Sequence, residues 1–284
     1  MSPFRLLAAP GRRAIALLAL AMSPGFFAAH AAEPVPVLDR GTLSLGLFDT
    51  SNELSGRWDS RRGSFGTPFS FQRDLGFDRS LRTPFWNAGL ALGRDRQFRL
   101  DGFHYSSDDD SSLVLDRSIE IDGARYEAGA RFEGSLDTST QGVSLTWFFR
   151  RTPHSATGVG LGALKYDIHS NLAAWVNVED SQASLRKTID EQAWVPLLRG
   201  EYVRVLGDRW RMGLAASYVE ADLDNVSGHV IDAHARFEYF PWRNVGVSLR
   251  YSYNRVDLDF SRTSYDGTID LHSRGPQLLA AFRF

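Results

Sequence analysis

The residues best suited to catalysis lie close together at Asp167, His169 and Ser170. An imidazole near a hydroxyl and a carboxylate can supply a general base, a nucleophile and an orienting group. Asp167 and His169 are two positions apart, so an extended chain places them on one face, whereas Ser170 points to the other. Contact between His169 and Ser170 is therefore not expected in a strand, and we predict no catalytic residue here.

Two acidic segments could bind a cation or take part in acid–base chemistry. Asp108–Asp110 is a run of three carboxylates, which could serve a calcium site or an acidic protease site. Asp222–Asn225 has some character of a calcium-binding loop, but it lacks the glycine and the distal glutamate of an EF-hand. We interpret Asp108–Asp110 as a solvated loop and predict no metal ligand in either segment.

Other enzyme motifs are missing or misplaced in the sequence. It contains neither a His-Glu-x-x-His zinc motif nor a Gly-x-Ser-x-Gly nucleophile elbow. Gly158, Gly160 and Gly162 alternate inside a strand pattern, which favours close packing over phosphate binding. Asp232 and His234 share one strand face and are predicted to form a structural hydrogen bond. We therefore expect no catalytic residue, no cofactor and no metal ion.

The composition excludes several classes of protein. The chain has 284 residues, with 32 Lys and Arg against 34 Asp and Glu, and a formal net charge of −2. That balance argues against binding of nucleic acid, which requires a basic excess. Cysteine is absent, which excludes disulfides, thiol catalysis and cysteine-ligated zinc. A hydrophobic content of 43% is that of a folded chain.

The first 31 residues have the layout of a secretory signal peptide. Three arginines precede the apolar run Ala14–Met22, which is too short to span a bilayer core of about 30 Å. Ala29 and Ala31 supply the small residues of a cleavage site. We predict cleavage after Ala31 or Ala32.

Beyond the signal peptide, apolar and polar residues alternate with period two. In Asn244–Tyr253, valine, leucine and tyrosine at odd positions alternate with glycine, serine and arginine at even positions. Such alternation indicates strands with one apolar and one polar face. Charges of both signs on the polar faces, and aromatic residues around the segments, favour a membrane barrel over a soluble sandwich. Similar segments are Thr42–Asp49, Thr138–Phe149, Trp210–Val219 and Val230–Phe240.

The C-terminus carries a family resemblance. Gln277–Phe284 alternates and ends on phenylalanine, and it resembles the C-terminal signature of Gram-negative outer-membrane β-barrel proteins. The resemblance implies localisation in the cell outer membrane and recognition of the segment ending at Phe284 by the barrel assembly machinery. Arg73–Asp78 and Tyr265–Gly267 also resemble segments of uncharacterised proteobacterial barrels, without implying an activity.

The fold class is therefore all-β, a single antiparallel transmembrane β-barrel. Alternation of short and long connections predicts ten strands, with short turns in the periplasm and long loops outside. Residues 1–31 are assigned to the signal peptide, 32–40 to a loose periplasmic lead-in and 41–284 to the barrel. Twelve strands are the alternative if Phe69–Leu75 and the stretch 118–132 add strands, and eight is a further one. The predicted strands are 41–50, 84–93, 97–106, 137–149, 156–168, 192–204, 209–221, 228–240, 244–258 and 272–284.

With the apolar faces outward, charged residues of both signs enter a narrow lumen. Opposite charges in such a lumen must pair or bind water, so we predict a largely filled interior, with a conducting pore as the alternative. The predicted inward residues are Arg99, Asp101, Lys165, Asp167, Arg199, Glu201, Arg211, Asp232, His234, Arg236, Glu238, Arg250 and Arg283.

The sequence thus predicts a monomeric outer-membrane barrel with a structural, surface-interaction or small-pore role. Its expected partners are outer-membrane lipid and lipopolysaccharide, not nucleic acid. The alternative is a barrel hydrolase with a site at the extracellular rim. Barrel lipid A deacylases carry a His-x-Ser-Asn pattern, from which His169–Asn171 departs because it lacks the spacer. No motif matches the acidic pair and His–Asp pair of omptin proteases.

Overall fold

The computed structural model describes residues 34–60, 65–93, 95–121, 124–178, 181–223, 226–261, 263 and 265–284. The predicted signal peptide, its cleavage site and the first two residues of the lead-in lie outside the described residues. The lead-in is described from residue 34 onward. Among these residues, no helix is long and apolar enough to cross a membrane.

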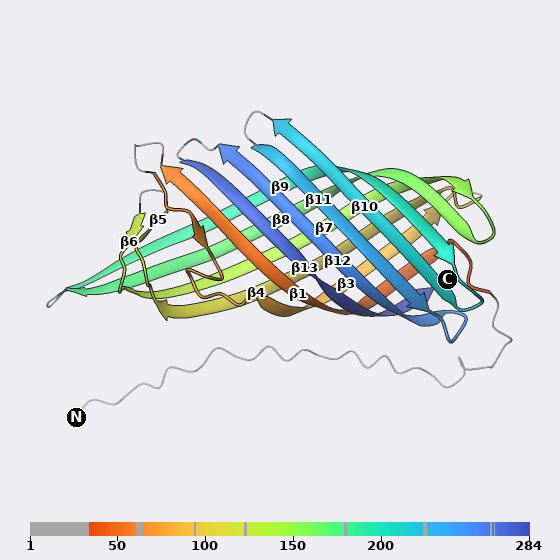
Figure 1. Cartoon of the computed structure of the whole chain (residues 1–284), viewed down its shortest axis with the longest axis horizontal. Coiled ribbons are helices and arrows are strands. Elements are labelled where there is room, and N and C mark those ends of the chain that lie inside the picture. Colours follow the sequence, from red (N-terminus) through yellow and green to blue (C-terminus); the bar gives the residue numbers. More distant parts are fainter. Residues whose placement is uncertain are drawn as a thin grey trace, which may run out of the picture. The chain divides into compact units, whose positions relative to one another are not determined.

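Ten long antiparallel strands form a closed ring within the described ranges (Figure 1). Each pairs with its neighbour along the chain, and the last strand closes the ring on the first, for example through Leu45 opposite Ala280. Closure gives every strand two neighbours, although β9 pairs with β10 only through Leu198–Val205, so that Ser181–Leu197 of β9 pairs with β8 alone. The ten strands are β1 (Gly41–Ser60), β3 (Ser80–Leu92), β4 (Phe98–Val114), β7 (Arg131–Arg151), β8 (Ser155–Val178), β9 (Ser181–Val205), β10 (Trp210–Leu223), β11 (Val226–Tyr239), β12 (Val245–Ser261) and β13 (Tyr265–Arg283).

The two ends of the barrel differ. At the end that we call the short-turn end, four turns connect β3 to β4, β7 to β8, β9 to β10 and β11 to β12. The C-terminus lies at this end (Figure 1), where the backbone N–H of Gly41 donates to the carbonyl oxygen of Phe284 over 2.8 Å. The opposite end, the long-loop end, carries the segments between β1 and β3 and between β4 and β7. These connections follow the predicted alternation.

Three stretches that the predicted strands left as long loops are mostly strand instead. Stretches 169–191, 222–228 and 259–271 continue β8 to β13, and β8 pairs with β9 as far as Val178 opposite Ser181. Asp108–Asp110 likewise lies within β4 and not in a loop. Backbone hydrogen bonds between strands form without contact to lipid. The hairpins can therefore extend beyond the segments in which the sequence shows an apolar outer face.

The segments suspected of adding strands to the barrel form small elements at the long-loop end. β2 (Phe69–Ser70) pairs with β1, and β5 (Ile119–Ile121) pairs with β6 (Ala124–Tyr126) in a separate hairpin. None of the three belongs to the closed ring, so the strand number stays at ten.

The apolar face of the barrel wall changes sides along its length. In β12, Leu249 is 56% exposed on the outer surface while Arg250 is buried inside. Farther toward the long-loop end, Val256 and Leu258 are buried inside and Asp259 is exposed outside. Exposed apolar side chains thus form a belt around the half nearer the short-turn end, which suits contact with lipid. The belt includes Leu45, Leu47, Trp86, Leu90, Leu100, Val143, Leu145, Trp147, Val159, Leu161, Trp194, Leu198, Leu214, Tyr218, Phe237, Val247, Leu249, Tyr251 and Leu278.

A hydrophobic core fills the barrel at the long-loop end. The segment after β1 supplies Phe69, Phe71, Leu75 and Phe77, and Phe71 is fully buried. These rings contact one another and Trp58, with the centroids of Phe69 and Phe71 separated by 5.3 Å. The remaining members come from the β5–β6 hairpin, from the residues that link it to β4 and β7, and from inward positions of the barrel strands. They are Leu54, Leu115, Ile119, Ile121, Tyr126, Ala130, Phe132, Leu136, Ile168, Leu172, Ala174, Ile189, Phe260 and Ile269.

Candidate functional site: the lumen and the outer rim

The centre of the lumen is a network of ion pairs around Glu201. The side chain of Glu201 is fully buried and accepts from Arg99 over 2.5 Å and from Arg236 over 3.0 Å. Arg199 lies 3.5 Å from the same carboxylate. Alternation in β4, β9 and β11 aims these side chains inward from three strands. The predicted salt-bridged interior is therefore present.

The network continues to the short-turn end through the lead-in. Arg211 donates to Glu238 and to Asp39, in each case over 2.7 Å. Arg283 lies 3.6 Å from the second oxygen of Asp39. Apolar neighbours hold the same segment, because Leu38 packs with Phe148 and Val203 inside the barrel.

Residues 34–40 are thus packed into the short-turn mouth, whereas a loose lead-in was predicted. The backbone N–H of Val35 donates to the carbonyl oxygen of Asp208 over 2.9 Å, and Val35 itself is buried against Phe240 and Ala281. Sequence reasoning missed this contact because a seven-residue segment without periodicity gives no indication of its partner.

Most of the predicted inward residues do face the lumen, with two exceptions. Lys165 and Asp167 lie on the outer surface, where they form an ion pair of 2.9 Å. The inward positions of that stretch are Leu164, Tyr166 and Ile168, which are buried in apolar clusters. The prediction for Lys165 and Asp167 was wrong because it assumed an apolar outer face along the whole strand.

The catalytic candidates from the sequence do not form a site. His169 faces outward, and the hydroxyl of Ser170 is buried and donates to the carbonyl oxygen of Ser135 over 2.9 Å. Asp109 accepts from the backbone N–H of Asp78 over 2.6 Å. Nε2 of His234 makes no hydrogen bond within the described structure, so Asp232 does not bond it there. Asp224 and Asn225 lie outside the described residues.

The alternating glycines of β8 are close-packed, as predicted. A Cβ atom at Gly160 would lie 2.4 Å from the carbonyl oxygen of Leu145, and one at Gly162 would lie 2.6 Å from that of Val143. Neither position could accept a side chain without movement of the neighbouring strand.

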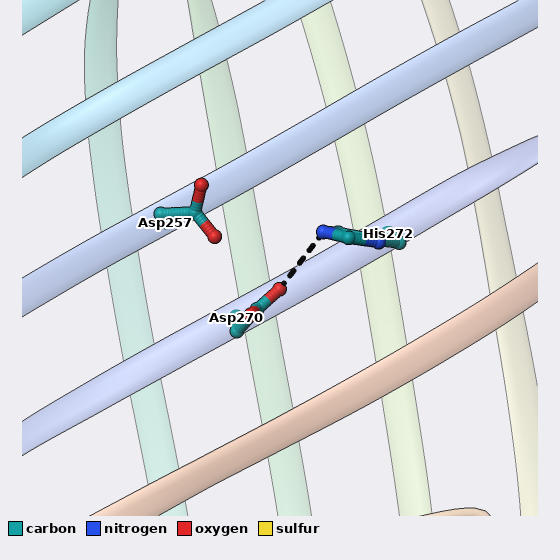
Figure 2. A group of neighbouring side chains, drawn as sticks. All are labelled: Asp257, Asp270 and His272. Carbon is teal, nitrogen blue, oxygen red and sulfur yellow. Dashed lines mark ion pairs between the residues drawn. The ribbon is translucent and has the colours of Figure 1, made fainter.

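A second group of ionisable side chains lies on β11 to β13, beyond the lipid-facing belt. Asp257 and Asp270 occupy directly opposite positions of β12 and β13, and Figure 2 shows Asp270 next to His272. Nε2 of His272 lies 3.1 Å from Asp270, and Nε2 of His229 lies 2.7 Å from Asp257. Burial and the facing carboxylate of Asp257 raise the pKa of Asp270 above its usual value.

This group, which we call the outer-rim cluster, has the donor atoms of a divalent-cation site. Ligand atoms of Asp257, Asp270 and His272 all lie within 4.8 Å of one another, so small rotations would bring them to metal–ligand distances. Arg255 competes, because its Nε already donates to Asp257 over 2.8 Å. The Asp-x-His spacing in β13 was a signal in the sequence, but the opposing Asp257 depended on strand register.

No protein-family model and no curated protein sequence matches the chain. Among solved structures, the outer-membrane protease OmpT of Escherichia coli is similar, with 9% identity, a TM-score of 0.61, and coverage of 86% of this chain and 96% of that one. The toluene transporter TodX of Pseudomonas putida matches with 8% identity and a TM-score of 0.34, covering 87% and 91%. Ail of Yersinia pestis matches with 10% identity and a TM-score of 0.31, covering 87% and 100%.

At these identities the likeness shows the fold alone. The chain has the fold of a Gram-negative outer-membrane β-barrel, and the expected localisation in the outer membrane agrees with that fold and with the exposed apolar belt.

Proposed function

We propose that this protein is a non-conducting outer-membrane barrel that acts through its extracellular surface. The observation that carries the proposal is closure of the lumen at both ends. The lead-in fills the short-turn mouth through Asp39 and Leu38, and the core around Phe71 fills the long-loop end. A large aqueous channel belongs to wider barrels of about 16 strands or more, so a structural or surface-interaction role fits this barrel better than a pore.

Recording across planar lipid bilayers tests the proposal. The mature wild-type protein should show no stepwise conductance. Deletion of residues 34–39 should leave it closed, because the core at the long-loop end remains. Deletion of both 34–39 and 65–77 should open a channel in the fraction that still shows a folded heat shift on gels. Stepwise conductance of the wild type would refute closure and favour the small-pore role.

Lipid and lipopolysaccharide are the proposed partners of the outer surface, with the barrel as a monomer. Exposed leucine and tryptophan side chains form the belt, and charged side chains such as Arg82 and Asp49 follow beyond it, 3.5 Å apart. Such a boundary matches the change from acyl chains to phosphate headgroups. The segment ending at Phe284 is proposed to bind the assembly machinery.

A hydrolase at the rim is the second candidate, and the outer-rim cluster favours it. Two imidazole–carboxylate pairs, His229 with Asp257 and His272 with Asp270, could activate a water molecule between them. Wild-type protein in lipopolysaccharide-containing vesicles should then cleave fluorogenic peptides, and His272→Ala should abolish cleavage. His154→Ala, in a short turn at the opposite end, is the control. Equal rates for protein-free vesicles and wild type would exclude this role for these substrates.

A further inference from the structure

Arg250 is a buried arginine without an ion-pair partner in the described structure. The residue is 8% exposed, and its Nε makes no hydrogen bond. Asp232 and Glu238 attract the guanidinium electrostatically but lie beyond ion-pair distance. Glu238 is already bonded to Arg211. The guanidinium lies over the ring of Phe85, 5.4 Å from its centroid, which covers one face and leaves the N–H edge free.

A second arginine sits directly opposite. Arg236 of β11 pairs in register with Arg250 of β12, and both line the same cavity. Like charges at opposed positions destabilise a sheet, and a buried charge without a partner is costly. Arg199 also lines the cavity, and its Nε is likewise unbonded. Three guanidinium groups therefore gather where Glu201 and Glu238 are already shared. The carboxylate of Asp232 also lines the cavity and forms no ion pair in the described structure.

The cavity that they line lies inside the barrel and is large enough for a small ligand. Its volume is about 90 Å³, which is room for roughly six water molecules at about 15 Å³ each. The ring of His234 also lines it, and Nε2 of His234 lacks a partner in the described structure. An occupant with several acceptor oxygens would satisfy the arginine donors.

We propose that this cavity binds a small oxyanion of the size of inorganic phosphate or sulfate. Guanidinium groups present paired N–H donors that match two oxygens of such an anion. Its negative charge would offset the repulsion between Arg236 and Arg250. Val37, Leu38 and Asp39 of the lead-in form part of the cavity wall, so the anion enters during folding or when the lead-in moves, and it exchanges slowly.

Refolding in the presence and absence of phosphate tests the site. Mature full-length protein is refolded into detergent micelles with sodium phosphate, or with sodium chloride at equal ionic strength, and passed through a desalting column. We expect about one phosphate retained per chain, and a higher urea midpoint with phosphate, because a ligand that binds only the folded state stabilises it. Equal midpoints with no retained phosphate would mean that the cavity holds water only, which overturns the proposal.

Substitution of Arg250 separates anion binding from general stability. Arg250→Met should retain no phosphate, and in chloride it should be at least as stable as the wild type, because an unpaired buried charge is removed. Arg250→Lys keeps the charge without the paired donors and should lower phosphate affinity by about tenfold. Arg274→Met, on the exposed outer surface, is the matched control and should bind like the wild type. Phosphate retention by Arg250→Met would assign the ligand elsewhere.

Discussion

Asp39 of the lead-in and Arg211 of β10 are 172 residues apart in sequence and form a buried ion pair of 2.7 Å. Their side chains are only 3% and 4% exposed. The pair fixes a segment that follows the predicted signal peptide to the inside of the finished barrel. The lead-in can therefore dock only after β10 has been positioned.

Asp39→Ala should destabilise the barrel and release the lead-in. Removal of one partner leaves Arg211 with one carboxylate fewer in a buried place, which costs about 3 kcal/mol. Urea unfolding in lipid vesicles measures the loss, and trypsin cleavage at Arg40 reports release of the segment. Asp49→Ala is the control, because its ion pair with Arg82 is about half-exposed. A similar loss for both variants would contradict the assigned role of Asp39.

The lipid-facing assignment of Leu249 predicts a strong effect of charge. Leu249→Arg places a cation midway along the apolar face of β12 and should cost roughly 2–4 kcal/mol of stability in vesicles. Thr268→Arg lies on the exposed outer face of β13 beyond the belt and should change stability little. Equal urea midpoints for the two variants would refute the position of the belt.

The core at the long-loop end should respond to Phe71 but not to Phe65. Phe71 is fully buried, whereas Phe65 is 85% exposed. Phe71→Ala should cost about 3–5 kcal/mol and speed proteolysis of the segment between β1 and β3. Phe65→Ala should match the wild type in the same digestion. Unchanged protection in Phe71→Ala would show that this core does not hold the segment.

Asp74 should make that segment sensitive to acid. Burial alone would raise its pKa, but hydrogen bonds from Arg117 and from the backbone N–H of Ser70 hold the pKa below its usual value. A lowered pKa means that the ionised form stabilises the fold above the unfolded pKa, and that this stability is lost as pH falls through the folded pKa. The protection of amides near Ser70 against hydrogen exchange, corrected for the intrinsic effect of pH on exchange, should therefore fall on acidification.

Asp74→Asn is the comparison for this acid effect. In this variant the amides near Ser70 should exchange faster than in the wild type at neutral pH. The exchange rates of the two proteins should converge at low pH. A constant difference between the two proteins across the pH range would contradict the role of the Asp74 charge.

Phe284→Ala should reduce assembly in cells more than stability in vesicles. The side chain of Phe284 is 69% exposed, and its backbone hydrogen bonds with Gly41 do not depend on the ring. Loss of the exposed ring costs at most about 1–3 kcal/mol of burial. The amount of heat-modifiable barrel in outer membranes is compared with refolding yield in pure lipid. Wild-type amounts in cells would show that the ring is not a recognition signal.

The sequence alone determined the fold class. It also determined which side chains face lipid and which face the lumen in the half of the barrel that carries the belt. In β12 the alternation of Leu249 with Arg250 assigns one face to lipid and one to the lumen, because strand side chains have period two. The count of ten strands followed from the turns. A salt-bridged interior with Arg99, Glu201 and Arg236 facing inward also followed, because a narrow barrel brings facing strands within reach.

Tertiary structure decided the features that depend on what fills the barrel and on register. Lys165 lies outside because its neighbours Leu164 and Tyr166 face inward and pack in an apolar cluster with side chains of β9, β11 and β12. No local pattern records that packing between distant strands. Asp257 meets Asp270 only through the register of β12 with β13. Arg250 lacks an ion pair within the described structure because Glu201 and Glu238 pair with other arginines and Asp232 lies beyond ion-pair distance. That arrangement of residues distant in sequence exists only once the ring has closed.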